Sequence, residues 1–409
     1  MNIKLVRNSN NEKQLLEITT LQSKVAVCFG EDVGVGEILE NANPMIDGLT
    51  IGKPDYDCIF VMRNPENCNI LNYVLDEIPI YLEQKIKKSY DICTDFMKMK
   101  KKSNVKEMLP FVRMNDLQIT NFLIDNSNPN TLFLLIKAEN ESVLISGDLR
   151  NFNIEENREK LTKCLELIES NVDYWIIDGN FIGKVEPNAL SENEISVKLK
   201  NVMDFYKQVF VIQSETDLMM TKRLYDIAQK TKKILIEDVF VANLTSEITG
   251  SAPNPMSKKN VYTYIPLVMD NRDFEFKRKY ISHFYIHNAE KYMKKEKYVI
   301  NINTDMIQDL QVFKKKNVMY DACLILAMNK KVLKINKELE DFINLISEFK
   351  LDYYEIYTSG RVNYDLINQI AYNIKPKKII PLNFNPNDKN IYNKIYDLKV
   401  LSDNEEFEV

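Results

Sequence analysis

A short polar segment in the first quarter of the chain has residue types that could support chemistry. Residues 61 to 69 read VMRNPENCN, between the strand-like run DYDCIF and the run ILNYVLDE, which has helical spacing. In α/β folds such a segment commonly carries functional side chains. Cys68 could act as a nucleophile if a positive charge stabilised its thiolate, and Arg63 is the local candidate. We expect a structural thiol instead.

The two histidines of the chain, His283 and His287, are the other candidates for chemistry. Their i, i+4 spacing on a predicted helix would place both rings on one face, where they could chelate a metal. No carboxylate or cysteine stands at a recognisable partner spacing. Ordinary surface or half-buried histidines are therefore the favoured interpretation.

The elements that must position these residues alternate between strands and helices. Apolar runs such as SKVAVCFG, TLFLLIKAE, ESVLIS and DYWIIDG predict buried strands, and EENREKLTKCLELIES predicts a helix between two of them. From about Ser191 the alternation becomes regular, which is typical of a parallel, doubly wound sheet. The end of the chain again predicts a strand, a helix (YDLINQIAYNI) and a strand (KKIIPLNF). The predicted fold class is α/β.

Read in this order, the chain resembles the metallo-β-lactamase-fold hydrolases with a β-CASP-like insert, the ribonuclease J-like group, over almost its whole length. The segments that carry the resemblance are LIDNSNPNTLFLLIKAENESVLISGDLRN, YWIIDGNFIG, YTSGRVNYDLINQIAYNIKPKKIIPLN and VLSDNEEFEV. The resemblance implies an αββα sandwich with an inserted parallel α/β domain. The expected domains are residues 1–190, the insert 191–350, and a return to the first domain over 351–409.

The family's chemistry requires two metal ions, usually zinc, that generate a hydroxide for hydrolysis. Its central motif, His-x-His-x-Asp-His, corresponds to VMRNPENCN, with Arg63, Pro65, Asn67 and Cys68 at the four ligand positions. An arginine repels a dication, a proline has no donor and an asparagine is a weak ligand, so only Cys68 could bind a metal well.

The remaining ligand positions of the family are also altered. Asn126 and Asn383 replace histidines, and Asp148 in SGDLRN is the retained ligand. The substrate-handling segment His-Thr-Ser-Gly-His becomes Tyr357, Thr358, Ser359, Gly360 and Arg361. We therefore expect no catalytic residues, no bound metal and no cofactor, and we expect Asp148 to have a loop or helix-capping role.

The insert departs from its family pattern as well. Relatives carry a Ser-x-x-Asn-x-Asp-Arg-like turn, in which Ser214 fits but Met219 and Met220 replace the Asp-Arg pair. Asp238 matches the family's strand end, and a carboxylate that caps the sheet edge is at least as good an interpretation as a functional one.

Two positively charged residues stand at the family's metal-binding cleft. Arg63 and Arg361 replace histidines, and a guanidinium suits phosphate or carboxylate recognition, so an anionic ligand is one hypothesis. The favoured alternative is that both arginines pair with Asp148 and Asp178 and fill the emptied site, because an unpaired buried charge is costly.

Three functions follow from these residues. The first is a pseudoenzyme that acts as a scaffold or regulatory binding protein, through a protein partner or self-association. The second is an RNA- or nucleotide-binding module that uses the inter-domain groove with Arg361 and residues Lys314 to Lys316. The third is a divergent hydrolase or nuclease with a site rebuilt around Asp148 and Cys68.

Composition limits the partners and the compartment. The net charge of −5 argues against a generic nucleic-acid binder. The six cysteines are scattered without a C-x-x-C pair, which indicates a reducing compartment. The N-terminus lacks an apolar signal core, and no run approaches the roughly 20 apolar residues of a membrane span. We expect a cytoplasmic protein without a membrane partner.

Overall fold

The computed structural model describes two units of the chain. Unit 1 contains the described residues up to Asp178 and from Tyr364 onward, and unit 2 contains those from Glu192 to Tyr357. The described residues are 1–7, 14–29, 45–62, 69–96, 102–124, 132–138, 140–146, 154–168, 172–178, 192–248, 253–265, 278, 281–282, 284, 289–294, 296–315, 319, 321–328, 337–357, 364–382, 397–401 and 404–409.

The first sheet of unit 1 has the strand order β19-β1-β2-β3-β4-β5-β6. Its strands are β1 (Asn2–Arg7), β2 (Gln14–Thr19), β3 (Lys24–Cys28), β4 (Cys58–Val61), β5 (Ile80–Leu82), β6 (Val105–Glu107) and β19 (Glu406–Glu408). Strands β3 to β6 pair in parallel, and the pairs from β19 to β3 are antiparallel. Strand β4 is buried on both faces, which explains its continuous apolar sequence.

The second sheet of unit 1 has the order β18-β11-β10-β9-β8-β7. Its strands are β7 (Phe111–Met114), β8 (Leu117–Leu123), β9 (Leu132–Ala138), β10 (Glu141–Ser146), β11 (Tyr174–Asp178) and β18 (Lys378–Leu382). Strands β10, β11 and β18 pair in parallel, so their carboxyl ends lie at one edge of the sheet. The other pairs are antiparallel.

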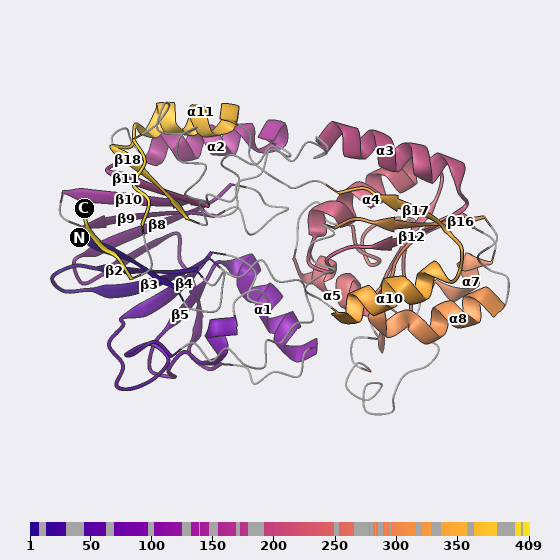
Figure 1. Ribbon diagram of the computed structural model, residues 1–409, viewed down its shortest axis with the longest axis horizontal. Coiled ribbons are helices and arrows are strands. Elements are labelled where there is room, and N and C mark those ends of the chain that lie inside the picture. Colours follow the sequence, from indigo (N-terminus) through magenta and orange to yellow (C-terminus); the bar gives the residue numbers. More distant parts are fainter. Residues whose placement is uncertain are drawn as a thin grey trace. The chain divides into compact units, whose positions relative to one another are not determined.

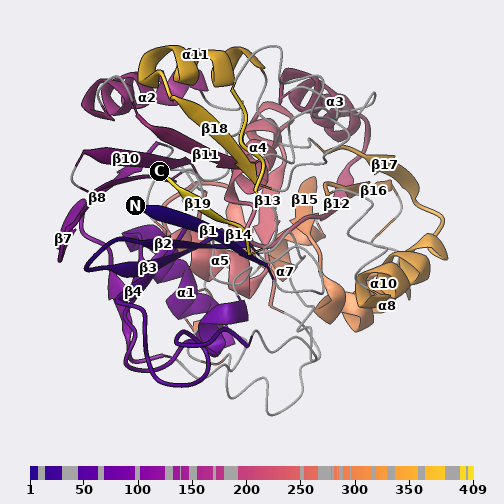
Figure 2. The same ribbon diagram turned by 60° about the vertical axis from the view of Figure 1, so that its left-hand side comes forward.

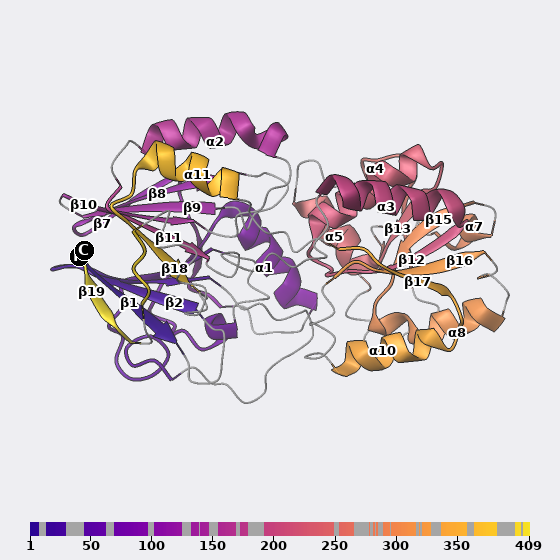
Figure 3. The same cartoon turned by 45° about the horizontal axis from the view of Figure 1, so that its top comes forward.

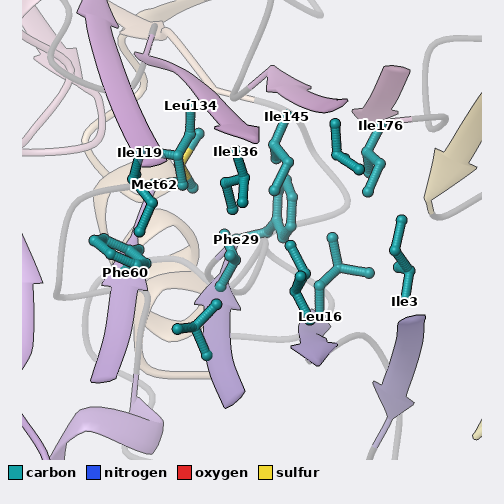
Figure 4. Packing of buried hydrophobic residues seen from close by; sticks show 14 of the residues in the cluster. Ile3, Leu16, Phe29, Phe60, Met62, Ile119, Leu134, Ile136, Ile145 and Ile176 are labelled. Atoms are coloured by element: carbon teal, nitrogen blue, oxygen red, sulfur yellow. The ribbon is translucent and has the colours of Figure 1, made fainter. Parts of the chain in front are cut away.

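The two sheets of unit 1 pack face to face around an apolar core. Figure 4 shows side chains of both sheets pointing toward one another, among them Ile3, Leu16, Phe29, Phe60, Met62, Ile119, Leu134, Ile136, Ile145 and Ile176. Helix α1 (Gln84–Phe96) covers the outer face of the first sheet. Helices α2 (Ile154–Ile168) and α11 (Tyr364–Ile374) lie side by side on the outer face of the second (Figures 1 and 2). Unit 1 therefore has four layers, helix, sheet, sheet and helix.

Unit 2 is built on one parallel sheet with the order β14-β13-β15-β12-β16-β17. Its strands are β12 (Gln208–Ile212), β13 (Ile234–Glu237), β14 (Val261–Thr263), β15 (Tyr298–Asn301), β16 (Ala322–Leu326) and β17 (Asp352–Glu355). Its helices are α3 (Glu192–Phe205), α4 (Leu218–Lys230), α5 (Val239–Glu247), α7 (Glu290–Met293), α8 (Ile307–Lys315) and α10 (Lys337–Ser347), with the 3-10 helix η5 (Thr304–Met306) before α8. Helices α3 and α4 pack on one face of the sheet, and α8 and α10 on the other (Figure 3). The mixed α/β class with parallel strands, predicted from the sequence, is confirmed.

The prediction of a helix after the polar segment 61 to 69 is wrong. Only a short 3-10 helix, η2 (Asn69–Asn72), forms there. The amide of Leu75 donates to the carbonyl of Leu49, at 2.9 Å, instead of continuing a helical ladder. Pro79, before β5, also disfavours helical backbone in the residue that precedes it. The longer helix α1 follows β5 and was not anticipated.

Strand β17 belongs to the sheet of unit 2. The sequence predicted instead that the return to the first domain begins at residue 351. The pairing of Cys323 with Asp352 and of Leu326 with Glu355 joins β17 to β16. The first described element of the return is α11.

The sequence predicts no apolar run long enough to span a membrane. Among the helices that the structure describes, none is both long enough and apolar enough to cross a membrane.

Candidate functional site

The candidate site of unit 1 is the edge of the second sheet at which three parallel strands end. Ile145, Ile176 and Ile380 are aligned across β10, β11 and β18, and Asp178 pairs with Leu382 one pleat further on. Asp178 is therefore the last residue of the central strand at this edge. In the sequence, Asp148 follows the end of β10 by two residues and Asn383 directly follows β18. Because the three strands are parallel neighbours, the chain leaves β10, β11 and β18 at neighbouring positions.

The end of β10 is fixed by a buried hydrogen bond. The indole Nε1 of Trp175 donates to Oγ of Ser146 at 3.0 Å, and that hydroxyl donates to the carbonyl of Ile176 at 3.3 Å. Trp175 and Ser146 are fully buried. This arrangement ties the last residue of β10 to β11.

The corresponding end of β4 in the first sheet leads into VMRNPENCN. Val61 pairs with Cys28 of β3 and with Leu82 of β5, so this strand also ends at a parallel edge. The described residues stop at Met62, whose side chain is buried in the core between the two sheets. Arg63 lies one residue beyond it in the sequence.

Most of the side chains predicted for the site lie outside the described residues. These are Arg63, Pro65, Asn67, Cys68, Asn126, Asp148, Ser359, Arg361 and Asn383. Asp178 is placed by its backbone at the strand end, and Tyr357 is half-buried after β17 in unit 2. The arginine and aspartate pairings predicted from the sequence remain predictions.

The cysteines within the described ranges are packed as apolar residues. Cys28, Cys58, Cys93, Cys164 and Cys323 are unbridged and buried. Burial raises the pKa of Cys164 and of Cys323 to about 12, and it also raises the pKa of Cys58. Thiols with such pKa values are neutral at physiological pH, so these cysteines are neither nucleophiles nor metal ligands in their folded positions.

No cluster of three or more His, Cys, Asp or Glu side chains that could hold a metal occurs within the described parts of either unit. His283 and His287 lie outside those parts. In unit 2, Met219 and Met220 are buried in the first turn of α4 and contribute to packing.

Asp238 caps a helix. Its Oδ1 accepts a hydrogen bond from the amide of Val241 at 2.8 Å, at the start of α5. This bond satisfies one of the amides that every helix N-terminus leaves without an internal partner. The sequence predicted a carboxylate that caps the sheet edge, whereas Asp238 caps the helix that follows the strand.

A group of buried polar side chains at the carboxyl edge of the unit 2 sheet was missed from the sequence. It consists of Gln213, Glu237, Thr263 and Asn301, each at or directly after the end of a strand. A polar residue that closes an apolar run is the signal that could have found it, as in VFVIQ, ILIE and YVIN.

Comparisons with known proteins relate the chain to folds of known structure. No protein-family model matches the chain, and no curated protein matches it. A solved protein of unknown function from Enterococcus faecalis V583 matches with a TM-score of 0.70 and 14% identity, covering 100% of this chain and 99% of that one. This likeness shows a shared fold.

The structural neighbours also include metallo-β-lactamase fold proteins, at low identity and with lower TM-scores. The subclass B3 enzyme MEM-A1 from a soil metagenome library has a TM-score of 0.28 and 11% identity, covering 42% of this chain and 74% of its own. The metallo-β-lactamase fold protein YhfI from Bacillus subtilis has a TM-score of 0.27 and 11% identity, covering 74% and 96%.

Proposed function

We propose that this protein is a degenerate metallo-β-lactamase-like protein with a β-CASP-like second unit, without hydrolytic activity, that acts as a scaffold or regulatory binding protein. The observation that carries the proposal is the distribution of histidine. Both histidines of the chain lie at positions 283 and 287, and the residues 1–187 and 360–409 contain none. A zinc-dependent hydrolase of this family relies on imidazole ligands at the strand ends of its sandwich domain.

The donors that remain at this edge of the sandwich support the proposal. At the edge where β10, β11 and β18 end, the sequence supplies Asp148, Asp178 and Asn383. Two carboxylates and a neutral amide are hard ligands that suit zinc less well than imidazole or thiolate. The described cysteines are buried, and burial raises the pKa of Cys58, Cys164 and Cys323, so these thiols do not compensate for the lost histidines.

The two arginines give the emptied site a structural role in this proposal. We infer that Arg63 and Arg361 pair with Asp148, at the retained ligand position, and with Asp178, and neutralise their carboxylates. Asp178 is the last residue of β11, Asp148 follows β10 in the sequence, and the two strands are parallel neighbours. This arrangement favours pairing of both carboxylates with the same cationic side chains. Such pairing is required if these charges are removed from water.

Two exposed apolar side chains on unit 2 support association with another chain. Val197 and Phe205 of α3 are 58% and 77% exposed and lie about two helical turns apart, with the exposed polar residues Asn201 and Asp204 between them. Each offers a separate apolar contact to a partner surface. A protein partner or a second copy of this chain would cover them.

The RNA- or nucleotide-binding alternative receives less support from the lysines near the end of α8. The Nζ of Lys314 donates to the carbonyl of Glu348 at 3.2 Å and lies 4.5 Å from the ring centroid of Phe349. This ammonium group already stabilises the turn after α10. It would have to leave these contacts to bind a phosphate, so Lys315, Lys316 and Arg361 would carry this alternative.

Metal content and hydrolysis test the proposal directly. Untagged protein is analysed for metals by mass spectrometry, and phosphodiesterase and ribonuclease assays are run on the same sample with added zinc or manganese. We expect less than about 0.1 equivalent of bound metal per chain and no turnover, because the imidazole ligands are missing.

The contrary result would support the rebuilt hydrolase. About one or two equivalents of metal that disappear on Asp148→Asn, but not on Asp55→Asn, would overturn the pseudoenzyme proposal. Asp55 is a suitable control because its carboxylate is exposed and pairs with Lys24 at 2.9 Å. Turnover lost with the metal would identify the Asp148 loop as catalytic.

A further inference from the structure

The carboxyl edge of the unit 2 sheet contains a topological switch point. Strands β12 and β15 are neighbours in the sheet. After β12 the chain continues into α4 on one face, and after β15 it continues through η5 into α8 on the other (Figure 3). In open parallel sheets, ligands bind outside the carboxyl ends of strands whose connections diverge in this way.

Four buried polar side chains lie beside this point. Thr263 pairs with Glu237 across β14 and β13, and Glu237 and Asn301 each follow the paired residues Ile236 and Ile300. Gln213 directly follows β12. Their exposed fractions are 0% for Thr263 and Glu237, 3% for Asn301 and 7% for Gln213.

All four side chains belong to the face of the sheet that α3 and α4 cover. Each lies two residues after one of Val211, Leu235, Val261 and Val299, which form the core on that face. Side chains two residues apart along a strand point to the same face of the sheet. Nε2 of Gln213 donates to Oγ1 of Thr221 in α4 at 2.7 Å. Oγ1 of Thr245 in α5 donates to Oε2 of Glu237 at 3.3 Å.

The remaining polar atoms of this group have no hydrogen-bond partner among the described residues. They are Oε1 of Gln213, Oε1 of Glu237, Oγ1 of Thr263, and both Oδ1 and Nδ2 of Asn301. A buried polar atom without a partner destabilises a fold by about 1–3 kcal/mol. Four oxygens left in this state on neighbouring strands therefore indicate a bound species that satisfies them.

The charge at this edge selects against an anion. Helix N-termini at the carboxyl ends of parallel strands usually bind phosphate through their amides. Here the carboxylates of Asp217 and Asp238 accept hydrogen bonds from Met220 and Val241 at the starts of α4 and α5. A third carboxylate, that of Glu215, accepts from Nδ2 of Asn303 at 2.8 Å.

We propose that unit 2 binds a monovalent cation, Na⁺ or K⁺, through the Glu237 carboxylate, the Thr263 hydroxyl and the amide oxygen of Asn301, which lie on the three successive strands β13, β14 and β15. Hard cations take oxygen ligands of these kinds. The single carboxylate neutralises one positive charge, whereas a divalent ion would leave a net buried charge. Because all three side chains are buried, the bound species must be small. This site is independent of the function proposed above.

Thermal unfolding of the full chain in NaCl, KCl and choline chloride at equal ionic strength tests the proposal. We expect the midpoint of unit 2 to be about 3 °C higher in Na⁺ or K⁺ than in choline. Trp175, the single tryptophan, lies in unit 1, so its fluorescence reports unit 1 as an internal control. Hydrogen exchange of β12, β13 and β15 reports unit 2.

Matched variants assign the effect to the site. Glu237→Gln removes the charge with little change in shape and should abolish the difference between the salts. Asp309→Asn is the control, because this buried carboxylate accepts from Tyr264 at 2.7 Å in the core on the opposite face. If Glu237→Gln does not fold, Thr263→Val removes one oxygen ligand and should weaken the salt response.

Two results would overturn the proposal. One is an equal unit 2 midpoint in all three salts, which would mean that neutral water molecules satisfy these atoms. The other is a salt response that persists unchanged in Glu237→Gln or in Thr263→Val, which would place the bound cation elsewhere.

Discussion

The side chains of Trp175 and Ser146 join the two strands that lead to the candidate site of unit 1. The indole Nε1 lies 3.0 Å from the serine Oγ, and both residues are fully buried. Ser146 is the last residue of β10, so this bond fixes the end of that strand. The end of β10 therefore depends on a contact with its neighbour β11.

Ser146→Ala should destabilise unit 1 by about 1–3 kcal/mol, because the substitution leaves the buried indole N–H without its acceptor. Urea unfolding followed by the fluorescence of Trp175 measures this change. Ser103→Ala, at an exposed position of the same unit, is the control and should have little effect. Equal stability of Ser146→Ala and the wild type would show that another acceptor replaces the hydroxyl.

Asp173 should make the stability of unit 1 sensitive to acid. Burial alone would raise the pKa of its carboxyl, but the ammonium of Lys377 at 2.5 Å and two hydrogen bonds from Ser142 outweigh that effect and lower the pKa. Because the folded pKa is below the unfolded value of about 3.9, the stabilisation is present above that value. It is lost as the pH falls through the lowered folded pKa.

Asp173→Asn should therefore be less stable than the wild type at neutral pH, and the difference should shrink below about pH 4. Unfolding midpoints at a series of pH values measure it. Glu159→Gln is the control, since Glu159 pairs with Lys163 on the exposed surface of α2, where an ion pair contributes little. A difference that stays constant down to about pH 2 would contradict the assigned pKa direction.

The buried cysteines should react slowly with thiol reagents in the folded protein. Burial keeps the thiols of Cys164 and Cys323 neutral, and the thiolate is the reactive form. Labelling followed by mass spectrometry should find both residues unmodified until guanidinium chloride is added. The same experiment on wild type and Cys68→Ser reveals whether Cys68 is the reactive thiol. Equal labelling rates of Cys164 with and without denaturant would disprove the prediction.

The exposed apolar side chains of α3 should contribute to association with a partner or with a second copy. Replacing Val197 and Phe205 together by serine should lower a measured association constant about tenfold or more, as is typical when central interface residues are truncated. Analytical ultracentrifugation of the purified chain measures self-association, and pull-down with an identified partner measures the other case. Tyr372→Ser, 79% exposed on α11 of unit 1, is the matched control. An unchanged constant would exclude these two contacts of α3.

Several elements could be predicted because their residues are buried whatever their neighbours are. The runs KVAVC, CIFV and ACLIL form strands β3, β4 and β16, since continuous apolar sequence fits a strand covered on both faces. Helix α2 was recognised from the spacing of its apolar residues. The helix cap formed by Asp238 was not predicted, although capping is local, between a side chain and an amide three residues later.

Only the tertiary structure decided other features. The predicted helix after residue 69 stops because the Leu75 amide bonds to Leu49, far away in the sequence. Strand β17 belongs to unit 2 because it pairs with β16. For the candidate site, the sequence by itself determined which donor types are present and that unit 1 contains no histidine. The structure decided that β10, β11 and β18 end side by side, and that Glu237, Thr263 and Asn301 lie on neighbouring strands with unsatisfied oxygens. The physical reason is that hydrogen bonds and burial between strands depend on sheet order and register, which no single strand's sequence contains.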